Sequence, residues 1–158
     1  MTSCVLRIKD ENKHNIVNIF INADGYPNGA PKIIANEFKD HKTVNAIPLT
    51  ADTEIINGIE DFSVRLIEFY KRMLFESAIK TRAVVETITG KLMPKEEERT
   101  LKAGGMYLIS ESEEYFCDYI YDIYNEGDKL YIKCFNEAGV ELFQGSFDDF
   151  TTWAETEE

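Results

Sequence analysis

The fold is decided by one stretch: Tyr115-Phe-Cys-Asp-Tyr-Ile-Tyr-Asp-Ile-Tyr124, then Asn125-Glu-Gly-Asp128, then Lys129-Leu-Tyr-Ile-Lys-Cys-Phe135. The two outer segments are rich in aromatic and β-branched residues and the middle one favours a turn, so together they predict a β-hairpin. We expect residues 124 and 129 to pair, which places Asp118 and Asp122 on one face with both lysines of the second strand. That face, with aromatic rings among its charges, should contact solvent.

Two further segments extend this hairpin. Met106–Ile109 and Val140–Ser146 also read as short strands, so we expect four strands joined as an antiparallel meander. Ser146 is suited to cap a short final helix, because Asp148 and Asp149 would lie at the positive end of its dipole. Trp153 should pack from that helix onto the sheet.

The N-terminal part predicts a second hairpin. Cys4–Ile8 alternates apolar and polar residues, and Ile16–Asn22 is again rich in β-formers. The six residues Asp24–Gly29 hold two glycines, a proline and an asparagine, which predicts a tight loop. Pro31 then suits the first turn of a helix that should end near His41.

The middle of the chain predicts irregular structure over 43–53 and then helix. One apolar stripe runs along the helical pattern: Phe62, Leu66, Phe69, Tyr70 and Met73. The pattern continues to Gly90, which is long for one helix, so we expect a break near Glu76–Thr81. We therefore expect one α+β domain over 1–158. It should hold an N-terminal β-hairpin, two or three helices, and a C-terminal antiparallel β-meander with a short final helix.

Composition gives the broad class. The 158 residues have 44% hydrophobic and 29% charged side chains, which is typical of a globular domain. The longest apolar runs are far shorter than the ~20 residues of a membrane span, and the first residues do not resemble a signal peptide. We expect a cytoplasmic protein with no membrane contact. Its cysteines, Cys4, Cys117 and Cys134, lie in apolar stretches and should be reduced core residues; the alternative is a reactive thiol.

The charge is segregated along the chain. Residues 110–158 hold fourteen acidic and two basic side chains, whereas residues 1–109 are balanced with fifteen of each, so the last third accounts for the whole net charge of −12. Such a field disfavours direct binding to nucleic-acid phosphates and favours a basic protein surface. The oligomeric state does not follow from the sequence.

Two interpretations of the predicted acidic face remain open. It is either an ordinary solvated face with cross-strand Lys–Asp pairs or a binding surface, because tyrosines beside acids are common at interfaces. The candidate partner-binding residues are Asp118, Tyr119, Tyr121, Asp122, Tyr124 and Tyr131.

No catalytic or metal-binding motif is present. His14 lies in a predicted turn, and His41 lies where a cation would stabilise a helix end. We therefore expect no metal, no cofactor and no catalytic residue, although a site built from carboxylates remains an alternative.

The loop before the first helix could instead present backbone N–H groups to a phosphate. It lacks a P-loop motif, so its glycines can equally serve the loop itself. The candidate ligand-binding residues are Asp24, Gly25, Tyr26, Asn28 and Gly29.

The segment Asp24-Gly-Tyr-Pro-Asn-Gly29 resembles the W-D-G-Y-P-E-G loop of a set of small phage and prophage proteins, most of them uncharacterised. Three further segments resemble that set in order and spacing: Asn57-Gly-Ile-Glu-Asp-Phe62, Gly104-Gly-Met-Tyr-Leu108 and Asp118-Tyr-Ile-Tyr121. Ala23 and Asn28 depart from it, because the family usually has Trp and Glu there. A site built on those two residues in relatives would be altered in this chain.

The resemblance implies an accessory protein that acts in the host cytoplasm, often by blocking host machinery such as antiviral defences. We therefore expect a non-enzymatic protein that binds and inhibits or modulates a host factor through the acidic, Tyr-bearing face. The alternatives are a module at Asp24–Gly29 that binds, sequesters or processes a small ligand or nucleotide, and a DNA mimic.

Overall fold

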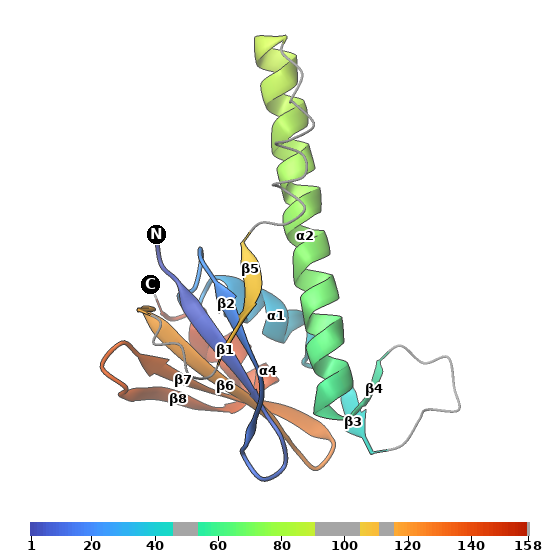
Figure 1. Ribbon diagram of the computed structural model, residues 1–158, viewed down its shortest axis with the longest axis vertical. Helices are drawn as coiled ribbons and strands as arrows, with labels where there is room; N and C mark the ends of the chain where they lie inside the picture. The colour runs from blue at the N-terminus through green and yellow to red at the C-terminus, as the bar shows by residue number, and fades with distance from the viewer. Residues whose placement is uncertain (46–53, 91–104, 111–115, 158) are drawn as a thin grey trace.

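The computed structural model describes residues 1–45, 54–90, 105–110 and 116–157 (Figure 1). Its centre is a six-stranded sheet in the order β5-β2-β1-β6-β7-β8. These strands are β1 (Cys4–Lys9), β2 (Asn15–Ile21), β5 (Met106–Ile109), β6 (Tyr119–Glu126), β7 (Lys129–Asn136) and β8 (Glu141–Ser146). A separate parallel pair, β3 (Lys42–Val44) and β4 (Ile55–Asn57), lies at one end. The helices are α1 (Ala30–Phe38), α2 (Gly58–Thr89) and α4 (Phe147–Ala154). The expected α+β class and order of elements are confirmed.

The central strand β1 joins the two halves of the sheet. It pairs with β2 as the expected antiparallel hairpin, and on its other side it pairs in parallel with β6, with Cys4 opposite Tyr119. The strands β6, β7 and β8 form the expected antiparallel meander. The expectation that Met106–Ile109 belongs to that meander was wrong. This strand, β5, pairs with β2 at the opposite edge, because β1 occupies the place beside β6.

The β6–β7 hairpin closes two residues later than expected. Glu126 pairs with Lys129 across a two-residue turn, and Gly127 at its first position has φ +60, a conformation that glycine adopts without strain. A shift of two residues preserves the faces, so Asp122 still lies opposite Lys133. The strand begins at Tyr119; Gly104 and Tyr115 lie outside the described residues.

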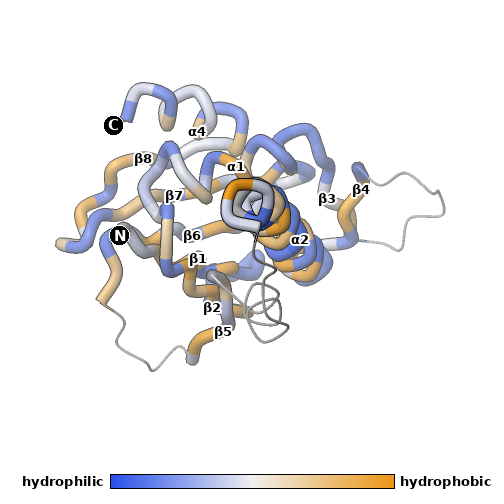
Figure 2. Tube along the Cα trace, turned by 90° about the horizontal axis from the view of Figure 1, so that it is seen from above, coloured by the Kyte–Doolittle hydropathy of each residue, from blue (hydrophilic) through white to orange (hydrophobic). Residues whose placement is uncertain are grey.

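The helices of the described residues, α1, α2 and α4, lie on the same side of the sheet (Figure 2). We call this side the covered face. It includes Leu6, Ile19, Tyr121 and Ile132 from the strands, which are at most 1% exposed. Against them pack Ile34 and Phe38 of α1, Phe62, Leu66 and Tyr70 of α2, and Phe147 and Phe150 of α4. Each helix buries one apolar stripe, so this single layer of helices provides the core.

The second helix is continuous over 32 residues, and the break expected near Glu76–Thr81 is absent. Neither glycine nor proline interrupts Ile59–Thr89, and Gly90 ends the helix in a left-handed conformation with φ +67. At 1.5 Å per residue the helix is about 48 Å long. Only its first half packs on the sheet, and the second half extends well beyond it (Figure 1). Pairs such as Arg82–Glu86, 2.8 Å apart, support that half from within the helix.

The shorter helices begin as the sequence indicates. Pro31 lies in the first turn of α1. At α4 the Ser146 hydroxyl accepts a hydrogen bond from the backbone N–H of Asp149 at 3.1 Å, and the ring of Trp153 stacks on Phe143 with centroids 4.9 Å apart. The predicted cap and the predicted contact between Trp153 and the sheet are both confirmed. In contrast, Lys42–Val44 is a short strand where irregular structure was expected, and 46–53 lie outside the described residues.

Candidate interaction surface

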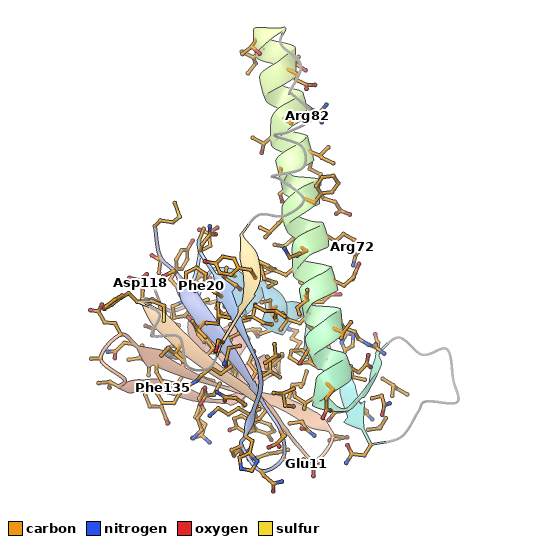
Figure 3. The ribbon with its side chains drawn as sticks, in the orientation of Figure 1. Glu11, Phe20, Arg72, Arg82, Asp118 and Phe135 are labelled. Atoms are coloured by element: carbon orange, nitrogen blue, oxygen red, sulfur yellow. The ribbon has the colours of Figure 1, made fainter. Side chains whose placement is uncertain are left out.

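The side of the sheet opposite the helices is the candidate site, and we call it the open face. No described helix lies on it. The strand registers place these side chains on it: Arg7, Lys9, Phe20, Tyr107, Ile120, Asp122, Tyr124, Tyr131, Lys133 and Phe135. Phe20 and Phe135 are labelled in Figure 3, on opposite halves of the sheet. The face therefore combines aromatic rings with charges of both signs.

The charges at its centre form a compact network around Asp122. The Arg7 guanidinium donates to one carboxylate oxygen of Asp122, and Lys9 Nζ lies 3.2 Å from the other. The Asp122 side chain is only 11% exposed, and those of Arg7 and Lys9 are 32% and 19% exposed. Both bases come from β1, which the parallel pairing brings beside β6. A buried carboxylate held by two cations contributes no outward negative field.

Aromatic rings surround this network. Phe20 and Tyr107 lie with their centroids 5.1 Å apart, and Tyr124 and Tyr131 stack at 5.9 Å. The Lys13 ammonium lies 3.5 Å from the centre of the Tyr124 ring, which places a cation on its π-face. These contacts hold the rings in fixed positions, and rigid aromatic rings are effective anchors at protein interfaces.

A shallow cavity of about 360 Å³ lies at one corner of the open face, where β6 begins. It is lined by Phe116, Asp118, Ile120 and the β7–β8 turn at Glu137. Phe116 is 99% exposed, so a large apolar ring lies beside this cavity in contact with water. Such a ring is a natural contact for a binding partner.

The six residues predicted to bind a partner do not share one surface. Asp122, Tyr124 and Tyr131 lie on the open face, but Tyr124 is only 2% exposed and so is not available to a partner as expected, and Tyr119 and Tyr121 point to the covered face. Tyr121 is fully buried and donates its hydroxyl hydrogen bond to the Gly25 carbonyl at 2.9 Å. Burial raises the pKa of Tyr121 far above its usual value. Tyr121 is therefore a core residue, and its assignment to a binding surface was wrong.

Asp118 has a structural contact of its own. Its carboxylate accepts a hydrogen bond from the Ser3 backbone N–H at 2.7 Å, while its backbone N–H donates to the Ser3 carbonyl. These bonds fix the start of β1 against the start of β6.

The acids of the last third that the structure describes do not gather on one face, which corrects the expectation of a single outward field. Asp148 and Glu155 lie on and beside α4, on the covered side, each 3.5 Å from a lysine of the N-terminal third, Lys39 and Lys32. With Asp122 they show that bases from residues 1–109 neutralise part of the excess. The acids left exposed at the border of the open face lie in and beside turns: Glu126, Asp128, Glu137 and Glu141. This distribution also differs from the regular line of charge that a DNA mimic needs.

The loop Asp24–Gly29 lies against the N-terminal strand. Gly25, Pro27 and Gly29 are buried, and Asp24, Tyr26 and Asn28 are exposed. A Cβ on Gly25 would lie 2.5 Å from the Ser3 carbonyl carbon, and one on Gly29 would lie 2.2 Å from the Asp24 carbonyl oxygen, so neither position has room for a side chain.

The hydrogen bonds of this loop bear on the phosphate hypothesis. The N–H groups of Gly25, Gly29 and Ala30 donate to the carbonyls of Thr2, Tyr26 and Asp24 respectively. Asn28 accepts from Lys32 Nζ at 2.9 Å. Three of the N–H groups that could bind a phosphate are thus already used within the fold. The geometry explains the glycines by the loop's own packing, and Asp24 keeps one unusual feature, a positive φ of 58.

The thiols and histidines have structural surroundings. No disulfide links the three cysteines. Burial raises the pKa of Cys134 to about 12 and the pKa of Cys4 well above its usual range, which keeps both as unreactive thiols. His41 donates its backbone N–H to the Phe38 carbonyl just beyond α1, and its ring lies 5.0 Å from that of Phe38. Within the described part of the chain, no three His, Cys, Asp or Glu side chains are placed to hold a metal ion.

Several residues of this surface were not among those predicted to bind a partner, including Arg7, Phe20, Tyr107 and Phe135. The alternation of Cys4–Ile8 already placed Arg7 on the polar side of its strand, but only the parallel pairing of β1 with β6 brings it to Asp122. Phe20 and Tyr107 become neighbours because β5 joins β2.

None of the described helices has a stretch apolar and long enough to cross a bilayer. Comparison of the chain with protein-family models, with curated proteins and with solved structures finds no match.

Proposed function

We propose that the protein is a non-enzymatic, phage-type accessory protein that binds a host protein through the open face of its sheet. The observation that carries this proposal is the one-sided architecture. The described helices cover one face of the six-stranded sheet. On the other face Tyr107 is exposed to solvent, and Phe20, Tyr131 and Phe135 are partly exposed. A sheet face of this size with fixed rings is a typical protein-binding surface.

The chemistry of the face indicates the kind of partner. Its centre is aromatic with internally paired charges, so the partner should bring apolar or aromatic groups there. Its border carries the exposed acids Glu126, Asp128 and Glu137, which favour basic residues on the rim of the partner. Rim charges mainly affect the association rate, so we expect binding to weaken only moderately as salt rises.

The resemblance of Asp24-Gly-Tyr-Pro-Asn-Gly29 to phage and prophage proteins supports a host factor, such as a component of antiviral defence, as the partner. This step rests on the resemblance alone, because the loop itself makes structural contacts.

The test is affinity capture from a host lysate with immobilised wild-type protein and two variants. The double variant Tyr131→Ala/Phe135→Ala removes two rings from the open face. The control Val64→Ala removes a 68% exposed side chain from α2. A partner should be retained by the wild type and the control, and its affinity for the double variant should fall at least about tenfold, as for truncation of interface anchors. Equal retention by all three proteins would exclude the open face as the binding site.

A second candidate function uses the loop Asp24–Gly29 as a nucleotide or small-ligand site. It is favoured only by the positive φ of Asp24 and by the exposed side chains of Asp24, Tyr26 and Asn28. Thermal-shift screening against nucleotides, cyclic ones included, tests it. A bound ligand at a hundred times its Kd stabilises the fold by about 2.7 kcal/mol, which raises the melting temperature by several degrees. The absence of any shift would remove this candidate.

A further inference from the structure

The two edge strands of the sheet differ in how they are protected. Edge strands expose unpaired N–H and C=O groups, and proteins usually protect them with charges, prolines or bulges. The edge strand β8 carries Glu141, and the β7–β8 pairing contains an irregularity beside Phe135. The other edge strand, β5, has the sequence Met106-Tyr-Leu-Ile109 and regular pairing with β2. It has none of these protective features.

The exposure of β5 makes this contrast sharper. Tyr107 is 49% exposed on the open face, and Leu108 is 60% exposed on the opposite face. Among the described residues, no strand pairs with the outer edge of β5, and an apolar strand with exposed side chains on both faces is suited to pair with another strand.

We propose that β5 pairs with β5 of a second copy of this chain, in an antiparallel dimer related by a two-fold axis. Charge favours a second copy at this edge. Two chains of net charge −12 repel one another, and the four residues of β5 include no acid, whereas the other edge strand, β8, carries Glu141. A two-fold interface brings identical surfaces together, and here those surfaces are neutral and apolar.

The backbone directions fix the register. The Asn22 N–H donates to the Gly105 carbonyl, so Gly105, Tyr107 and Ile109 direct their backbone groups toward β2. Met106 and Leu108 direct theirs outward. A two-fold axis at Tyr107 pairs Met106 of each copy with Leu108 of the other and satisfies all four outward groups of each strand. The two Tyr107 side chains then face one another, and the open faces of both copies become continuous.

Sedimentation velocity across about 1–300 μM tests the dimer, a range that covers weak interfaces of small area. We expect concentration-dependent dimerisation that strengthens with added salt, because screening reduces the repulsion between the two acidic chains. Leu108→Pro removes an outward N–H and leaves the pairing with β2 intact, so it should raise the dimer Kd at least about tenfold. The control Leu142→Pro, on β8, should leave the dimer Kd unchanged, with circular dichroism confirming that both variants fold.

Disulfide capture tests the register. At a non-hydrogen-bonded pair the Cα atoms lie about 4.5 Å apart, within the range of a disulfide, so Tyr107→Cys should form a covalent dimer on mild oxidation. The wild type and Leu142→Cys are the controls and should not. Monomer at all concentrations in both low and high salt, or a dimer that persists in Leu108→Pro, would overturn the proposal.

Discussion

The covered and open faces of the sheet are built from the same strands but stabilised differently. Along β6, Tyr121 points into the covered face, where it is fully buried and its hydroxyl donates to the Gly25 carbonyl. The next residue, Asp122, points into the open face, where its carboxylate is held by Arg7 and Lys9. The covered face thus depends on packing, and the open face depends on paired charge and ring contacts.

This difference shows that the segregation of charge along a sequence does not carry over to its distribution in space. The last third of the chain holds the excess acid, but β1 and α1 come from the first third and bring bases to it. The open face is therefore a mixed surface, and its acids remain exposed mainly at the turns.

The largest difference between the faces should appear on truncating an aromatic ring. Phe62→Ala, on the covered side, should lower the free energy of unfolding by about 3–5 kcal/mol, because it leaves a cavity in a rigid core. Phe135→Ala, on the half-buried open face, should cost less than half as much. Urea denaturation measures both, and equal losses would show that the open face is packed like a core.

The next effect should come from the charge network. Asp122→Ala leaves Arg7 and Lys9 close together without their shared partner, so we expect a loss of about 1–3 kcal/mol in the free energy of unfolding. Glu126→Ala is the matched control, since that carboxylate is 58% exposed and 3.7 Å from Lys13, and its loss should be close to zero. A loss for Asp122→Ala no greater than for Glu126→Ala would mean that the network does not contribute to stability.

Alkaline pH should lower the free energy of unfolding through Tyr121, the buried tyrosine of the covered face. Burial raises the pKa of Tyr121, so the folded protein keeps the phenol proton that the unfolded chain releases near pH 10. The unfolded state then binds fewer protons, and the free energy of unfolding falls as pH rises, by about 1.4 kcal/mol per pH unit for this one group. Tyr121→Phe removes this titration, so its stability should fall less steeply above pH 10 than that of the wild type. Parallel slopes in urea titrations at pH 9–11 would show that the phenol is not buried.

The smallest effect is expected for Lys133→Ala on the open face. Its ammonium lies 3.9 Å from Glu141, a long distance for an ion pair, and the two side chains are 32% and 46% exposed, so the change in the free energy of unfolding should stay below about 0.5 kcal/mol. The same urea measurement checks it. A loss comparable to that of Asp122→Ala would extend the network across β7.

Local patterns predicted most of the elements, but not the order of the strands. Turn residues, the Ser146 cap and Pro31 act within a few residues of chain; the cap and the helix start at Pro31 are confirmed, and the β6–β7 turn is displaced by two residues. The position of β5 beside β2 and of β1 beside β6 depends on pairing between distant segments, which period-two patterns do not encode. The break expected in α2 was wrong because average helix length was given more weight than the absence of helix-breaking residues.

Only part of the candidate surface was predicted, because the rest of it also depends on pairing between distant segments. The sequence identified Asp122, Tyr124 and Tyr131, whose face follows from alternation within one hairpin. It could not identify the bases that neutralise Asp122, because these come from a strand more than a hundred residues away. It also placed Tyr121 at the surface, since a tyrosine is compatible with either environment until its hydroxyl partner is known.

The position of β1 also sets the order in which the molecule can fold. This strand needs partners on both edges, and one of them, β6, is made more than a hundred residues later. During synthesis the β1–β2 hairpin must therefore wait with the β6-facing edge of β1 unpaired until residues 119–123 have emerged from the ribosome. We expect folding to be slow, because it depends on long-range contacts. We also expect chaperones to bind the nascent chain at its unpaired N-terminal hairpin until β6 is made.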